Sequence, residues 1–168
     1  FHITVPNLIE NFKSSKNVEL KSRYLTSLSY ILKSTPIQIK SNFTVQLMPL
    51  LLEALNVSNS DVKTSSLQTI KDTLETQSDI IAQHIHTLVS QCLGLLDYTD
   101  EHNSIKVRHL SLEILHLFTK TIPVNYLQPY KTEIIKKLVV SLEDPRRMIR
   151  KLAIDTRESY YELGQVII

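Results

Sequence analysis

Residues 62–70, with the sequence VKTSSLQTI, decide the fold of this chain. An apolar residue precedes a basic one, and apolar residues return five and eight positions after the first, as they do along one face of a helix. Similar stretches begin at positions 20, 107 and 149, so that successive stretches lie 42, 45 and 42 residues apart. Periods of about 40–47 residues are typical of HEAT and armadillo arrays, whereas tetratricopeptide and ankyrin repeats run about 33–34 residues.

The helix expected before each of these stretches repeats as well. Its apolar residues step by four, which keeps them on one helical face. The three sets that align are Leu47, Leu51 and Leu55; Leu88, Cys92 and Leu96; and Ile134, Leu138 and Leu142. A single hairpin of two such helices cannot bury both of its apolar faces, so neighbouring hairpins must stack. We therefore predict an all-α fold, an armadillo-like α-solenoid of about four HEAT-type helical hairpins.

The whole chain is expected to form one domain. Its approximate repeats are residues 1–35, 36–77, 78–122 and 123–164. Prolines and polar turns mark the limits of the helices, and Asp144 before Pro145 predicts a capped helix start. Both ends are apolar, at Phe1 and at residues 166–168, which suggests a fragment of a longer solenoid.

The composition excludes several classes of function. Only two glycines occur, Gly94 and Gly164, too few for the phosphate-binding loops of Rossmann or P-loop proteins. The single cysteine, Cys92, cannot complete a disulfide, a zinc site or an iron–sulfur site by itself, and we expect it to be a buried core residue. A net charge of +2 is too small for bulk attraction to nucleic acid, and no apolar run approaches the ~18 residues of a membrane span.

Metal and catalytic sites are not predicted. His84 and His86 lie two positions apart and point to different sides of a helix, whereas His109 and His116 lie two turns apart. No HExxH, GxSxG or comparable motif organises the serines, carboxylates and histidines. We therefore expect a protein that is not an enzyme, with no catalytic residue, no metal and no cofactor.

The fourth stretch departs from the other three within residues 144–163, DPRRMIRKLAIDTRESYYEL. Arg157 stands where the other stretches have Leu28, Ile70 and Leu115, and an unpaired guanidinium is costly to bury. Two compatible interpretations are a polar cap on the array and a partner-binding surface, since arginine and tyrosine often anchor interfaces. The predicted partner-binding residues are Arg146, Arg147, Arg150, Lys151, Arg157 and Tyr161.

On a helix, the residues of this segment divide into two stripes. One stripe has charges of both signs and is expected to be a solvated face. Its members are Arg147, Lys151, Asp155, Glu158 and Glu162. The other stripe, Arg150, Ile154, Arg157 and Tyr161, combines basic, aliphatic and aromatic residues.

The same segment resembles the C-terminal end of a known adaptor family. The resembling residues, within roughly 127–164, are Pro129-Tyr130-Lys131, Leu142-Glu143-Asp144, Arg146-Arg147, Ile149-Arg150-Lys151, Ala153, Arg157 and Leu163-Gly164. The family is the large HEAT-repeat adaptor of the cytosolic iron–sulfur protein assembly targeting complex, named for methionine auxotrophy in yeast and methyl-methanesulfonate sensitivity in animals. Residues 1–126 are similar only as generic repeats, and Tyr160-Tyr161 stands where another aromatic pair is expected.

This resemblance implies a function that the repeat period does not. Members of the family bind a small partner subunit of the targeting complex through their C-terminal repeats, and through it a β-propeller subunit. Together these subunits present apoproteins for cluster insertion, including DNA-repair and replication enzymes. The resemblance thus implies a non-enzymatic adaptor without cluster ligands of its own, located in the cytoplasm and the nucleus.

Two other interpretations are open from the sequence. A HEAT scaffold of another pathway, such as a nuclear transport receptor or a phosphatase scaffold, would use the face lined by the second helices. Lys63 and Arg108 are then expected to matter more for binding than Arg150. A nucleic-acid-binding domain is less expected, because acidic residues interleave with the arginines, and it would show a steep salt dependence.

Overall fold

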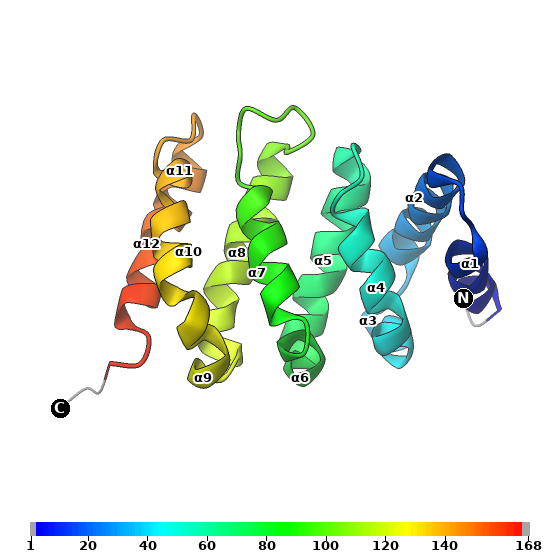
Figure 1. Ribbon diagram of the computed structural model, residues 1–168, viewed down its shortest axis with the longest axis horizontal. Coiled ribbons are helices and arrows are strands. Elements are labelled where there is room, and N and C mark those ends of the chain that lie inside the picture. Colours follow the sequence, from blue (N-terminus) through cyan, green and yellow to red (C-terminus); the bar gives the residue numbers. More distant parts are fainter. Residues whose placement is uncertain (1–2, 166–168) are drawn as a thin grey trace.

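A computed structural model describes residues 3–165 and shows a row of antiparallel helical hairpins (Figure 1). The hairpins follow one another from the N-terminal to the C-terminal end of the row, and the described residues contain helices, turns and loops but no strand. The prediction of an all-α solenoid is confirmed. Phe1 and residues 166–168, whose apolar side chains suggested a fragment of a longer solenoid, lie outside the described residues, and so does His2.

The helices divide into two layers. The second helices of the hairpins are continuous and lie beside one another in chain order, so that α5 packs between α2 and α8, and α8 packs between α5 and α12. They are α2 (Val18–Ser34), α5 (Ser60–Thr76), α8 (Ile105–Thr121) and α12 (Arg147–Glu162). Stacking of neighbours in this way buries the apolar faces that one hairpin leaves open.

The first helices are mostly interrupted. They are α1 (Thr4–Ser14); α3 (Ile37–Lys40), η1 (Ser41–Phe43) and α4 (Thr44–Ala54); α6 (Ser78–Ala82) and α7 (Ile85–Gly94); and α9 (Val124–Leu127), η2 (Gln128–Tyr130), α10 (Lys131–Lys137) and α11 (Val139–Leu142). Pro49 lies inside α4 and Pro129 lies in η2. Proline removes a helical N–H donor and crowds the preceding turn, which favours the break at Pro129. Helix α4 continues through Pro49, and the break between α6 and α7 contains no proline.

The second helices of the first three hairpins begin at side-chain caps. Asn17 accepts hydrogen bonds from the first-turn N–H groups of α2, Asn59 does so for α5, and Ser104 caps α8. The predicted start of α12 is wrong, because this helix begins at Arg147 rather than directly after Asp144. The Asp144 carboxylate still accepts from the Arg146 N–H at 2.8 Å, but its main partner lies in another hairpin, as described below.

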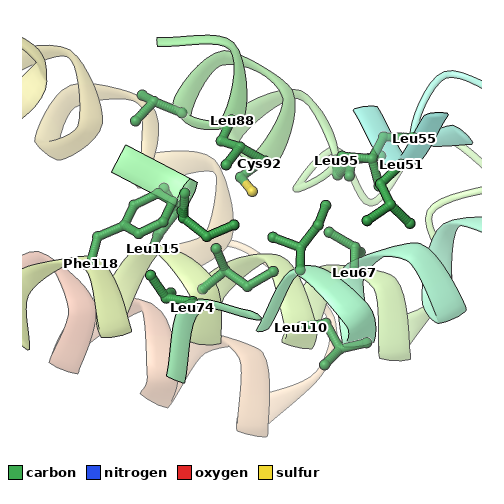
Figure 2. Close-up of a cluster of buried hydrophobic side chains, with 14 of the residues drawn as sticks. Leu51, Leu55, Leu67, Leu74, Leu88, Cys92, Leu95, Leu110, Leu115 and Phe118 are labelled. Carbon is green, nitrogen blue, oxygen red and sulfur yellow. The ribbon is translucent and has the colours of Figure 1, made fainter. Parts of the chain in front are cut away.

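One apolar core runs along the solenoid. Figure 2 shows its middle part, where Leu67 of α5 and Leu115 of α8 meet Leu88 and Cys92 of α7. All four side chains are buried, as the sequence pattern predicts. Burial raises the pKa of the Cys92 thiol to about 12, so this cysteine is protonated at neutral pH and acts as a small core residue.

Candidate partner-binding face on the last helix

The last helix, α12, is fixed to the solenoid by one side. Ile149, Ala153, Thr156 and Tyr160 are buried on that side, where α12 packs against α8. The Tyr160 hydroxyl donates a 2.6 Å hydrogen bond to the backbone carbonyl of Leu115. This bond satisfies a polar group inside an apolar contact, which sets the height of α12 along α8.

The opposite side of α12 faces solvent. Its exposed residues recur every three or four positions, the spacing of one helical face. The ones that define the surface we call the α12 face are Arg147, Lys151, Ile154, Glu158 and Tyr161, and Asp155 and Glu162 are exposed along its edge. The two stripes expected from the sequence therefore meet in one surface, with basic residues near its start, Ile154 in the middle and Tyr161 near its end.

Ile154 is the unusual member of the α12 face. The equivalent position in the other three second helices is Leu25, Leu67 or Leu112, and each of these side chains is buried. Ile154 is 56 % exposed. Among these four equivalent positions, only the one on α12 leaves its aliphatic side chain in contact with water.

Arg157 is held beside this face by contacts with two residues, Ile135 and Tyr161. Its Nε donates to the backbone carbonyl of Ile135 at 3.0 Å, and its guanidinium lies 5.6 Å from the centre of the Tyr161 ring. A further donor of Arg157 lies 3.4 Å from the Tyr161 hydroxyl. The guanidinium that the sequence placed at an apolar position is therefore partly exposed and hydrogen-bonded, and it orients Tyr161.

The six predicted partner-binding residues fall into two groups. Arg146, Arg147, Lys151 and Tyr161 are exposed. Arg150 and Arg157 are only partly exposed, and both donate to backbone carbonyls. Arg150 braces the turn before α12, with distances of 2.7 Å to the Asp144 carbonyl and 3.0 Å to that of Pro145.

Sequence reasoning placed Ile154 in a mixed stripe but did not include any aliphatic residue among the predicted partner-binding residues. Ile154, Met148, Val139 and Val140 are all exposed on α12 or on α11 beside it. Ile154 is visible in the repeat pattern as one of four equivalent aliphatic residues. Its exposure is not, because burial at that position depends on the hairpin that stacks against it.

The basic residues of the repeat pattern have a different role in the interior. Arg108 is buried, and its Nε donates to the buried Asp144 carboxylate at 2.7 Å, while another donor bonds the Asn103 carbonyl at 2.6 Å. Lys63 is buried one hairpin earlier and donates to the Asn103 side chain at 3.0 Å. These residues join successive hairpins, so substitutions at Lys63 or Arg108 are expected to change stability, and binding by such a variant is compared only once the variant is known to be folded.

His116 of α8 contacts the C-terminal half of α12. Its Nδ1 lies 3.3 Å from the Ser159 hydroxyl. Burial lowers the pKa of His116 below its ordinary value of 6.5; Lys120 acts in the same direction and Asp155 opposes it. The unfolded chain therefore binds a proton more readily than the folded protein.

The melting temperature should consequently fall as pH is lowered through about 6.5. In the His116→Gln variant, which cannot take up this proton, the drop between about pH 7.5 and about pH 5.5 should be smaller. Thermal unfolding of both proteins at the two pH values, followed by circular dichroism, checks this. An equal drop in both proteins would exclude His116 as its source.

The described part of the chain was also compared with what a metal site and a membrane-spanning helix require. Within residues 3–165, no three His, Cys, Asp or Glu side chains gather in an arrangement able to hold a metal ion. None of the described helices combines the length and the apolar character needed to cross a membrane.

Comparison with known proteins places the chain in a family. Residues 1–119 match the family model described as RNAPII transcription regulator C-terminal, of the MMS19 type. The MMS19 DNA repair/transcription protein of Saccharomyces cerevisiae is 39% identical over 159 residues, which is 95% of this chain and 15% of that protein. The human MMS19 nucleotide excision repair protein homolog is 31% identical over 164 residues, or 98% of this chain and 15% of that protein.

A third relative extends the range. The DNA repair/transcription protein mms19 of Schizosaccharomyces pombe is 30% identical over 156 residues, which is 93% of this chain and 15% of that protein. The chain therefore spans only about 15% of the length of these relatives. Their similarity covers nearly the whole chain, beyond the 127–164 segment that carried the resemblance in the sequence. The chain belongs to the MMS19 family, as part of its C-terminal domain.

Proposed function

We propose that this domain is a non-enzymatic adaptor that uses the α12 face to bind the small partner subunit of the cytosolic iron–sulfur assembly targeting complex. Through that subunit it engages a β-propeller subunit and helps deliver clusters to apoproteins. The observation that carries the proposal is the exposure of Ile154. This aliphatic residue is 56 % exposed, although the equivalent residue is buried in each of the other three hairpins.

The composition of the α12 face fits a protein partner. Ile154 and Tyr161 offer apolar area at its centre and end, and Arg157 holds the Tyr161 ring in place. Arg147 and Lys151 supply positive charge at the rim, where it favours encounter with an acidic partner and adds to specificity. Glu158 interrupts this charge, which argues against a nucleic-acid backbone as the partner.

The names of the relatives support the choice of clients. They describe DNA repair, nucleotide excision repair and transcription, and they do not describe an enzyme. An adaptor that serves DNA-repair and replication enzymes must meet cluster-assembly factors and nuclear clients. We therefore propose that the protein works in both the cytoplasm and the nucleus.

Replacing Ile154 by aspartate should weaken binding of the small subunit by about 2 kcal/mol or more, roughly a thirtyfold rise in Kd, because a charge would replace a central apolar contact. Isothermal titration of the subunit into this domain measures the change. The matched control is Val45→Asp, which changes another exposed apolar residue, on α4, far from α12 in the row of hairpins.

Circular dichroism establishes that both variants remain folded. Binding that is unchanged in a folded Ile154→Asp protein contradicts the assignment of the α12 face. A similar loss in Val45→Asp shows that the effect of Ile154→Asp is not specific to this face.

A further inference from the structure

A polar pocket lies at the edge of the solenoid that carries the turns before α5 and α8. It occupies about 370 Å³ between the end of α4, the end of α7 and the long turn at residues 97–104, which projects at this edge in Figure 1. The residues relevant here are Asn56, Lys63, Gln91, Asp100 and Asn103. The pocket is separate from the α12 face.

Lys63 is the feature that makes this pocket unusual. Its side chain enters from the first turn of α5, and the residue is only 6 % exposed. The ammonium group has three N–H donors, and its one acceptor among the described residues is the Asn103 side chain, at 3.0 Å. No carboxylate of the described residues lies within 4.0 Å of it. A buried charge without a counter-charge is costly.

The next hairpin shows what is missing. Arg108 occupies the position equivalent to Lys63, and its counter-charge is the Asp144 carboxylate of the following turn. In the turn that Lys63 reaches, the acceptor is Asn103, a neutral amide. The amide nitrogen of Asn103 is itself engaged, since it donates to the Asp97 carbonyl at 3.1 Å. Asn103 is therefore fixed in place but leaves the Lys63 charge unbalanced.

The pocket wall has further unused polar capacity. The side-chain carbonyl oxygen of Gln91 is buried without a hydrogen-bond partner among the described residues, while its amide nitrogen donates to the Leu52 carbonyl. Asp100 stands at the rim, where its carboxylate accepts from the His102 N–H at 2.8 Å. Buried polar groups in folded proteins are nearly always satisfied, so this wall is suited to a ligand that completes it.

We propose that the pocket binds the carboxylate of an aspartate or glutamate side chain of a partner protein, with Lys63 as the charged donor. The ligand carboxylate takes the place that Asp144 takes beside Arg108. Asp100 at the rim repels a doubly charged group such as phosphate more strongly than a singly charged carboxylate. The position on the turn edge of a solenoid makes the pocket reachable by a loop of another protein.

The probe is N-acetyl-aspartate N-methylamide, titrated into the ¹⁵N-labelled domain while amide shifts are recorded. Shifts should concentrate at Lys63, Gln91, Gly94 and Asn103. The Lys63→Met variant, with an amide spectrum that shows it to be folded, should bind at least tenfold more weakly. The control Lys136→Met removes an equally charged but exposed lysine of α10 and should leave the titration unchanged.

A second variant, Asn103→Asp, provides an internal carboxylate for Lys63. It should lose binding of the probe while keeping the amide spectrum of a folded protein, which separates occupancy of the site from unfolding. The uncharged N-acetyl-asparagine N-methylamide should cause at least tenfold smaller shifts than the aspartate probe. Equal shifts with inorganic phosphate, or shifts that persist in Asn103→Asp, would overturn the proposal.

Discussion

Replacing Arg108 by methionine should lower the free energy of unfolding by roughly 3–5 kcal/mol. The Arg108 guanidinium and the Asp144 carboxylate are both buried, and their closest atoms are 2.7 Å apart. Methionine keeps most of the apolar stem but leaves the Asp144 carboxylate without its counter-charge. The bond to the Asn103 carbonyl is lost as well. Because these contacts join the third hairpin to the fourth, the loss should be felt across the interface between α8 and α12.

Urea unfolding followed by circular dichroism measures this loss. The control is Lys137→Met, because Lys137 pairs with Glu133 on the exposed surface of α10 at 2.8 Å. Such a pair is worth only about 0.3–0.5 kcal/mol. Adding Asp144→Asn to the Arg108 variant removes the stranded charge but keeps the acceptor for the Arg146 N–H, so part of the stability should return. A loss below about 1 kcal/mol in Arg108→Met would contradict the importance of the pair.

Replacing Tyr160 by alanine should cost about 3–5 kcal/mol of stability, as large-to-small substitutions of buried aromatic residues do. Tyr160 is among the largest fully buried side chains of the described residues. Its ring fills the contact between α12 and α8, and burial together with nearby Cys92 raises the pKa of its hydroxyl well above the usual value. The hydroxyl is therefore a neutral donor at physiological pH.

The Tyr160→Phe variant separates the ring from the hydroxyl. It keeps the ring and loses only the 2.6 Å bond to the Leu115 carbonyl, so it should cost about 1 kcal/mol. Both values come from the same urea titrations. Equal losses in the two variants would mean that the hydroxyl, and not the packing of the ring, fixes α12. Partner binding should survive Tyr160→Phe, because the residue points away from the α12 face.

Substitutions at Tyr160 and at Ile154 separate two roles of helix α12. The side of α12 that carries Tyr160 determines whether the last hairpin stays attached. The side that carries Ile154 and Lys151 is open to a partner. The two sides carry different residues because, on a helix, residues three or four positions apart share a side and the residues between them do not. Stability and the proposed partner binding thus depend on different residues of the sixteen-residue helix α12.

The sequence predicted the solenoid because each helix carries its own apolar face, and the spacing of Leu67 and Ile70 or of Leu112 and Leu115 is a local property of the chain. The repetition of that spacing at one period then required stacking. The family resemblance was also contained in a local segment. The sequence could assign partner binding only to a group of residues. It could not say which of them share an exposed surface.

Only the tertiary structure decided which side chain pairs with each basic residue of the repeat pattern. Arg108 and Asp144 are 36 positions apart, and their pairing depends on how two hairpins stack. Lys63 reaches a neutral amide instead of a carboxylate for the same reason. Ile154 looks like its buried equivalents in the sequence and differs only in having no hairpin of the described chain against it. Burial and pairing are properties of neighbours in space, and the period of a repeat fixes the positions of residues without fixing their partners.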